Sequence, residues 1–166
     1  DLLWMDDSLR VALGDIVEMM NAKGTWWGKF QEDMILNKNG ETHKRLRDVL
    51  APAFTPRQAI KHRALMREEI GKLLDEWAPK GAFDFEEFAS NFPIRVISRL
   101  VGLPASMIPQ LLDAMEALGQ SLNMDPEFMA RLQAAAKLMY ETVENLVAGR
   151  RAGERLGPEE DMQIGR

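Results

Sequence analysis

The sequence predicts an all-α protein, and three observations lead to this prediction. Apolar residues recur at spacings of three and four along most of the chain, which is the period of an amphipathic helix. The alternation of apolar and polar residues that is typical of strands is nearly absent. Of the 166 residues, 46% are hydrophobic and 28% are charged. This balance is sufficient for a packed helical core.

The first part of the chain contains one predicted helix and one predicted loop. A stripe of apolar residues from Leu9 to Met20, behind Asp7 or Ser8 as a cap, predicts the first helix. Residues 21–40 are rich in glycine and predict a long irregular loop between the first and second helices. This loop contains five large apolar residues: Trp26, Trp27, Phe30, Met34 and Ile35. A loop with so much aromatic surface is usually functional or packed onto the body.

The remaining helices follow from caps, prolines and apolar stripes. Pro52 forces the helix that begins near Glu41 to end or kink. Thr55 and Pro56 form a start signal for the next segment, and Pro93 predicts an internal bend in a later one. Asp125 and Pro126 mark the start of the last helix. The expected helical ranges are 41–51, 56–77, 86–102, 104–122 and 125–151.

Composition excludes several classes of function. The net charge of −5 argues against a dedicated nucleic-acid-binding protein. No run of about 18 apolar residues is present, so we expect no membrane span and a cytoplasmic protein. There is no cysteine, which excludes a thiolate ligand from these residues. The two histidines, His43 and His62, have no carboxylate cluster around them, so no metal site is predicted.

The two ends of the sequence suggest a piece of a longer protein. The chain opens on "DLLWMDDS" without an initiating methionine, and it stops just after Pro158 would begin another helix. We therefore expect residues 1–166 to form a single, incomplete helical domain.

One face of the predicted helix 41–51 combines aliphatic and basic side chains. At 100° per residue, the side chains of His43, Leu46, Arg47 and Leu50 fall within an arc of about 100°. A buried arginine keeps its charge and requires an anion, and the i, i+4 spacing directs His43 and Arg47 to one point. The pair therefore suits an acidic group on an apolar body. The alternative is a half-buried face from which Arg47 reaches water or pairs with a glutamate.

Two segments of the sequence resemble a known family. "NGETHKRLRDVLAPAFTP" (39–56) resembles helix C and the following turn of the cytochromes P450, the thiolate-haem monooxygenases. "FPIRVISRLVGLPASMIPQL" (92–111) resembles their helix E running into helix F. The resemblance extends from residue 6 to about residue 162 and corresponds to the region from helix B through helix G of soluble bacterial members. It implies the N-terminal part of the cytochrome P450 fold.

The resemblance assigns roles to several residues. In that family the histidine and arginine of helix C bind a haem propionate, which implies this role for His43 and Arg47. The loop 21–40 resembles the segment between helices B and C, which lies over the haem. The helix that contains Leu112 and Met115 resembles helix F, the roof of the pocket. The implied substrate-pocket residues are Trp26, Trp27, Phe30, Met34, Ile35, Leu112 and Met115. Packing of these side chains in the core is the alternative interpretation.

The resemblance also implies an electron-transfer partner. Lys44, Arg45, Arg57 and Lys61 would lie on the side of the haem that receives an acidic, ferredoxin-type partner, where complementary charge speeds the encounter. The alternative is an ordinary solvated helix face.

The sequence departs from the family at three places. The cysteine that ligates the iron, the E-x-x-R pattern and the acid–alcohol pair of the long central helix do not occur in these residues. The chain therefore holds the implied propionate contacts and much of the pocket, but neither the iron ligand nor the proton relay. We expect the isolated chain to be inactive and to self-associate or refold around exposed apolar surface.

The resemblance thus implies part of a cytochrome P450 that uses haem to activate dioxygen and hydroxylates a small hydrophobic substrate. Electrons would come from NAD(P)H through the redox partner. The alternative is a non-enzymatic helical interaction or regulatory module. A helix-turn-helix DNA-binding protein built on "THKRLR" fits poorly with the net charge.

Overall fold

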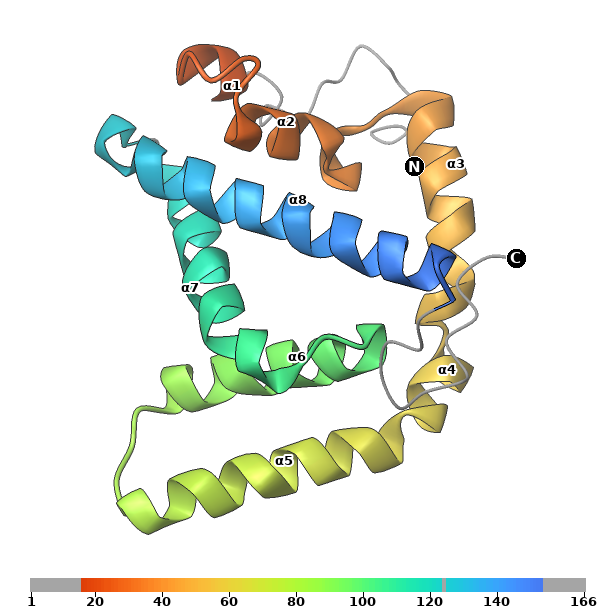
Figure 1. Cartoon of the computed structure of the whole chain (residues 1–166), viewed down its shortest axis with the longest axis vertical. Helices are drawn as coiled ribbons and strands as arrows, with labels where there is room; N and C mark the ends of the chain where they lie inside the picture. The colour runs from red at the N-terminus through yellow and green to blue at the C-terminus, as the bar shows by residue number, and fades with distance from the viewer. Residues whose placement is uncertain (1–15, 124, 154–166) are drawn as a thin grey trace. The chain divides into compact units, whose positions relative to one another are not determined.

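The computed structural model describes residues 16–123 and 125–153, and every regular element within them is a helix. The predicted all-α class is confirmed. The α-helices are α1 Ile16–Met19, α2 Trp26–Asp33, α3 Gly40–Leu50, α4 Pro56–Lys61, α5 Arg63–Trp77, α6 Phe85–Val101, α7 Ile108–Gly119 and α8 Met129–Arg151 (Figure 1). Short 3₁₀ helices occupy Ile35–Asn37, Ala51–Phe54, Ala78–Lys80, Ala105–Met107, Gln120–Asn123 and Pro126–Phe128. Residues 7–15 of the predicted first helix lie outside the described residues.

The prediction of an irregular loop over residues 21–40 is wrong, because α2 forms in its middle. Thr25 caps this helix: its backbone is extended, and its Oγ1 accepts a hydrogen bond of 3.1 Å from the Gly28 N–H. Gly28, which favoured a loop in the sequence, lies within this helix and faces the backbone of Ala22. A Cβ added there would lie only 2.1 Å from the Ala22 carbonyl oxygen. Glycine here permits close packing rather than flexibility.

Caps and prolines place the other helix boundaries close to the predicted ones. Thr55 caps α4 as expected, with its Oγ1 accepting from the Gln58 N–H at 3.3 Å. The expected continuous helix 56–77 is interrupted at His62, whose φ of −88° and ψ of 5° depart from α-helical geometry. Asp84 caps α6, and Gly102 ends it in the left-handed conformation with φ of 82°. Pro93 lies inside α6, as predicted.

The chain divides into two compact units. Among the described residues, unit 1 comprises 16–52, 114–123 and 125–141, and unit 2 comprises 53–113 and 142–153. The single incomplete domain expected from the sequence stays a prediction.

Unit 1 has a core built from α1, α2 and α8. Trp27 is completely buried at its centre, beside Val17 and Leu132. Ala114, Ala117 and Ala135 form a second cluster between the C-terminal part of α7 and the N-terminal part of α8. Small residues at these positions let two helix backbones approach each other closely.

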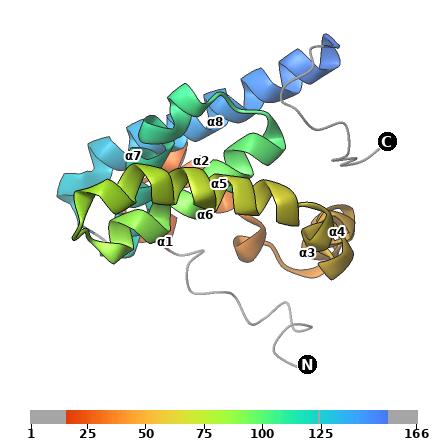
Figure 2. The same ribbon diagram turned by 90° about the horizontal axis from the view of Figure 1, so that it is seen from below.

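Unit 2 is centred on α5 and α6, which lie side by side (Figures 1 and 2). Leu73, Trp77 and Phe88 form its core, and the rings of Trp77 and Phe88 meet edge to face at 5.8 Å. Arg95 of α6 and Glu76 of α5 form a two-pronged ion pair at 2.8 and 2.6 Å. This geometry joins the two helices outside their apolar contact.

Candidate functional site

Helix α3, which contains His43 and Arg47, forms within one residue of the predicted bounds. Its first residue, Gly40, has φ of 57°, a conformation that glycine adopts without strain. Glu41 in the first turn and Arg47 in the last turn complement the helix dipole. The 3₁₀ helix that contains Pro52 follows directly.

His43 and Arg47 differ in exposure. His43 and Leu46 are half-buried, whereas Arg47 is exposed and Leu50 is 37% exposed. No residue of α3 is buried. The expectation that this face is buried and directs Arg47 into the interior is therefore wrong. The alternative expectation, a half-buried face, agrees with α3 in unit 1.

The donors of His43 and Arg47 suit a carboxylate. Within residues 16–123 and 125–153, neither side chain forms an ion pair or a hydrogen bond with a protein group. The pair lies one helical turn apart beside Leu46, so an acid group with an apolar body could meet both donors. This donor set fits a haem propionate. It does not fit the iron, since the chain has no cysteine, and the described residues hold no group of three potential metal ligands.

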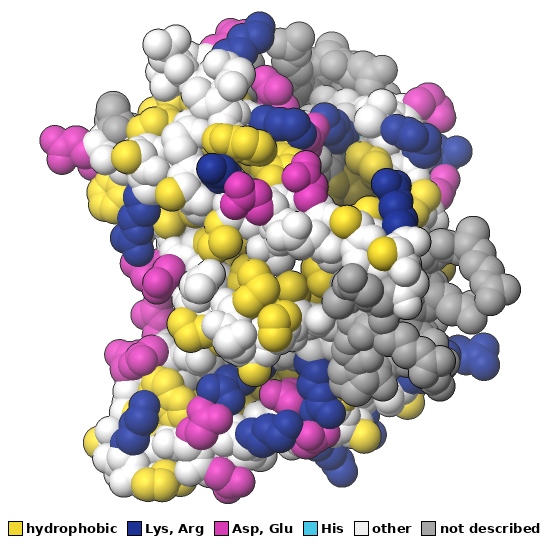
Figure 3. Space-filling model, in the orientation of Figure 1, with side chains coloured by type: hydrophobic (Ala, Val, Ile, Leu, Met, Phe, Trp, Pro, Cys, Tyr) yellow, Lys and Arg dark blue, Asp and Glu magenta, His cyan; other side chains and the backbone are white. Residues whose placement is uncertain are grey.

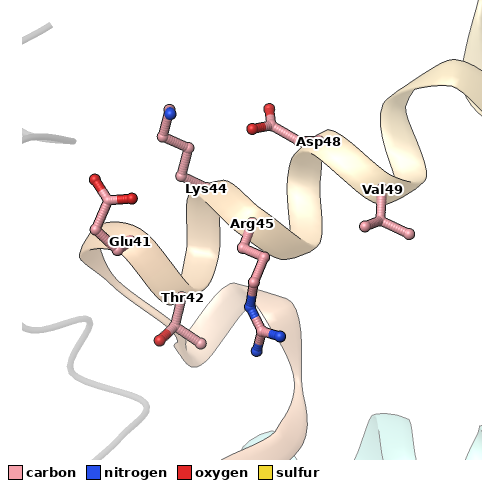
Figure 4. Close-up of a pocket in the computed structure, with 6 residues that line it drawn as sticks. All are labelled: Glu41, Thr42, Lys44, Arg45, Asp48 and Val49. Atoms are coloured by element: carbon pink, nitrogen blue, oxygen red, sulfur yellow. The ribbon is translucent and has the colours of Figure 1, made fainter.

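The other face of α3 is exposed and carries charges of both signs. Glu41, Thr42, Lys44, Arg45, Asp48 and Val49 line an open depression on it (Figure 4). The side chains of Lys44 and Asp48 extend from one side of the helix and Arg45 from the other. Lys44 and Arg45 thus lie in unit 1, while Arg57 and Lys61, also exposed, lie in unit 2.

The two tryptophans of the predicted pocket have different surroundings. Trp27 is 0% exposed, and its backbone N–H donates to the Gln133 Oε1 at 2.9 Å. Trp26 is 42% exposed and lines a cavity of about 520 Å³ with Lys29, Met129 and Gln133. The burial of Trp27 fits core packing, whereas Trp26 is available to a ligand.

The other predicted pocket residues are divided between the units. In unit 1, Phe30 is half-buried against the Trp27 cluster, Met34 and Ile35 are half-buried, and Met115 is 49% exposed. Leu112 is half-buried in unit 2. The role of all seven as a substrate pocket stays a prediction.

A polar cluster on the surface of unit 1 was not foreseen. The Tyr140 hydroxyl donates to the Asp33 Oδ2 at 2.7 Å, and the Lys29 ammonium lies 2.7 Å from the same oxygen. Lys29 also lies 4.3 Å from the centre of the Tyr140 ring, and Trp26 is 5.7 Å from that ring. The spacing of Lys29 and Asp33 was the available sequence signal. Tyr140 is 107 positions from Asp33, so no local pattern could have connected them.

The cluster shifts three pKa values. Hydrogen bonds with Asp33 and then Tyr140 raise the pKa of Lys29 above its usual value. Hydrogen bonds from Lys29 and then Tyr140 lower the pKa of Asp33 below its usual range. Burial, followed by the hydrogen bond to Asp33, raises the pKa of Tyr140. Asp33 is therefore ionised and Tyr140 is neutral at pH 7. In these states the Tyr140 hydroxyl can donate to the Asp33 carboxylate, and this hydrogen bond joins α2 to α8.

Comparison with known proteins points to one family, although no family profile matches the chain. Luteothin monooxygenase of Streptomyces thioluteus is 26% identical over 144 residues, which are 85% of this chain and 35% of that protein. Polyketide biosynthesis cytochrome P450 PksS of Bacillus subtilis is 38% identical over 76 residues, covering 45% of this chain and 19% of the relative.

A solved structure has the same fold. The chain aligns with P450BioI, crystallised in complex with an acyl carrier protein carrying hexadec-9Z-enoic acid, with a TM-score of 0.71 and 23% identity. The alignment covers 84% of this chain and 36% of P450BioI.

The fold and the relatives agree: both are similar to the N-terminal part of cytochromes P450. The relatives that the chain matches are cytochromes P450, and the chain spans about a third or less of their length. Among the described residues, no helix is long and apolar enough to cross a bilayer.

Proposed function

We propose that the protein is part of a cytochrome P450 monooxygenase that activates dioxygen with haem and hydroxylates a small hydrophobic substrate. The observation that carries this proposal is the similarity to luteothin monooxygenase over 85% of the chain. The P450 fold over 84% of the chain agrees with it. Because the chain lacks a cysteine, these 166 residues alone are expected to be inactive.

In this proposal His43 and Arg47 hold the haem by one propionate. Both donors lie on one face of α3 without a protein partner among the described residues. The Arg47 guanidinium would neutralise the carboxylate, and the half-buried imidazole of His43 would fix its position. When bound, haem supplies the oxygen-activating chemistry. His43 and Arg47 orient the group and take no part in bond breaking.

The substrate side of the proposal rests on α2. Trp26 presents an exposed aromatic face to the 520 Å³ cavity, which is large enough for a small organic molecule. Phe30, Met34 and Ile35 follow on the same segment, and Leu112 and Met115 belong to α7. Their apolar side chains favour a hydrophobic substrate.

The basic residues of α3 and α4 are proposed to meet an acidic, ferredoxin-type protein that delivers electrons from NAD(P)H. Lys44, Arg45, Arg57 and Lys61 are all exposed, which such an encounter requires. A cytoplasmic location, where this partner and cofactor occur, belongs to the same proposal.

Haem titration of the chain tests the proposed propionate contact. We expect a saturable Soret band, and at least a tenfold weaker haem affinity when His43→Ala and Arg47→Ala are combined, because two charge-assisted hydrogen bonds are lost. Lys44→Ala combined with Asp48→Ala has the same spacing on the exposed face and is the matched control. Equal haem affinity in both double variants would contradict the assignment.

The exposure of Arg47 favours one alternative, a non-enzymatic helical interaction or regulatory module. An exposed guanidinium is satisfied by water and needs no haem. The same titration separates the two functions, because a module of this kind has no reason to bind haem in a manner that depends on His43 and Arg47.

A further inference from the structure

Unit 2 contains a cavity that the proposed function does not use. It has a volume of about 640 Å³ and lies among α5, α6 and the segment that leads into α7. Both polar and apolar side chains line it, and its volume is within the range of sites that hold small organic ligands. All its lining residues belong to unit 2.

The charges of this cavity neutralise one another. Three acidic and three basic side chains line it. Glu69, which is 7% exposed, accepts from Arg99 at 2.7 Å and from Lys72 at 3.1 Å. Figure 3 shows charges of both signs alternating over the region of α5 and α6. A ligand with a full charge would have to compete with these pairs, so the lining favours a neutral one.

Two residues that line the cavity each have a buried polar group without a protein partner among the described residues. Ser98 is only 2% exposed, and its hydroxyl has no hydrogen bond to a described residue. The Arg95 Nε is also buried and unpartnered, while the two other guanidinium nitrogens are held by Glu76. Buried polar groups are normally satisfied. A donor at Arg95 and a hydroxyl one helical turn away together suit an oxygen acceptor.

Apolar side chains also line the cavity. Leu103, Ile108 and Leu112 line it, together with Trp77 from α5. The lining therefore combines charged and polar side chains with apolar ones, so a molecule that has both an apolar and a polar part could contact both kinds.

We propose that this cavity binds a neutral amphiphile, a molecule with an apolar body and one carbonyl or hydroxyl oxygen that meets Arg95 Nε–H and Ser98 Oγ. The site is independent of the proposed haem contact on α3.

The experiment uses the full 166-residue chain and the probe 6-propionyl-2-dimethylaminonaphthalene, which is neutral, apolar and carries one carbonyl oxygen. We expect its emission to shift to shorter wavelength and to saturate at one equivalent. The anionic probe 1-anilinonaphthalene-8-sulfonate should bind at least tenfold more weakly to the same site. Far-UV circular dichroism establishes that every variant retains its helical content.

Two variants locate the site. Ser98→Ala removes an unsatisfied hydroxyl, so it should preserve the fold and weaken probe binding about three- to tenfold. Ala105→Trp introduces an indole at an exposed residue of the cavity rim and should abolish binding. Ala130→Trp, at an exposed position of unit 1, is the matched control and should bind as the unmodified chain does.

The proposal would be overturned if the helical chain showed no saturable probe binding, as expected for a cavity filled by water alone. Unchanged probe binding in Ala105→Trp would also overturn it. So would an equal loss of probe affinity in Ala105→Trp and Ala130→Trp. Haem affinity plays no part in these results, so the proposal stands or falls separately from the proposed function.

Discussion

Gly28 shows how one residue can be decisive for unit 1. Replacement by alanine should favour a helix by up to about 1 kcal/mol on propensity alone. The new Cβ would, however, lie 2.1 Å from the Ala22 carbonyl oxygen, and backbone cannot move aside as a flexible side chain can. We expect Gly28→Ala to lower the free energy of unfolding by about 1–3 kcal/mol, the usual cost of overpacking. Urea unfolding followed by tryptophan fluorescence measures this.

Gly71→Ala is the matched control for Gly28→Ala. Gly71 lies within α5, and a Cβ there meets no atom within 4 Å. Alanine should therefore stabilise this helix by up to about 1 kcal/mol. Two glycine substitutions in helices with opposite effects would show that the close approach, and not helix propensity, controls Gly28. A stabilising Gly28→Ala would contradict the packing described for α2.

The Asp33 carboxylate should give unit 1 a stability that depends on pH. Its folded pKa is lowered, so its contribution is present above the unfolded pKa of about 3.9 and is lost as the pH falls through the folded value. Asp33→Asn should cost at most about 1 kcal/mol at pH 7, because the side chain is half-exposed. This cost should shrink below about pH 4.

Urea midpoints at pH 7, 5 and 3 test the role of Asp33. Asp48→Asn on the exposed face of α3 is the control, and we expect it to change the midpoint little at any of the three values. If the urea midpoints of the unmodified chain and Asp33→Asn differed by the same amount down to pH 3, the carboxylate charge would not be what stabilises the contact with Lys29 and Tyr140.

At the scale of an element, α2 depends on its cap. Thr25 Oγ1 accepts from the Gly28 N–H at 3.1 Å and donates to the Ala22 carbonyl at 2.6 Å. Thr25→Ala removes both bonds, and we expect it to destabilise the chain by about 0.5–2 kcal/mol. Amide hydrogen exchange should accelerate over Trp27–Gln31 first, because this short helix frays from its start.

Thr55→Ala at the start of α4 is the comparison for Thr25→Ala. Thr55 caps in the same way, but with a longer bond of 3.3 Å. Faster exchange should then be confined to the first turn of α4. If Thr25→Ala left exchange in α2 unchanged, tertiary burial of Trp27 rather than the cap would be what holds the helix.

The elements also show how far sequence could predict this fold. Local signals were sufficient for α3, α6 and α8, because their caps and prolines stand beside long periodic stripes. They failed for α2, because a glycine in the sequence indicates a loop. Glycine is required at position 28 because its backbone lies close to the Ala22 carbonyl, and no local pattern shows this contact. For the site, helical spacing correctly placed His43 and Arg47 on one face. It could not predict the exposure of Arg47, which depends on how α3 packs against segments distant in the sequence.

At the scale of the whole molecule, apolar exposure bears on association. Phe54 is 74% exposed and Ile60 is 68% exposed, and they lie six positions apart in unit 2. Large exposed apolar side chains favour contact between molecules. We expect the 166-residue chain to associate reversibly, as the sequence suggested, with a weight-average mass that rises with protein concentration in sedimentation equilibrium.

Replacing Phe54 and Ile60 by serine should reduce this association. Both side chains are exposed, so their loss should change the free energy of unfolding little and leave helical content unchanged, while removing apolar area that would be buried between molecules. Arg57→Ser, at an exposed polar residue between them, is the control and should leave the association constant unchanged. A chain that stays monomeric at millimolar concentration, or a Phe54→Ser and Ile60→Ser variant that associates as strongly as the original, would show that these side chains do not form the contact.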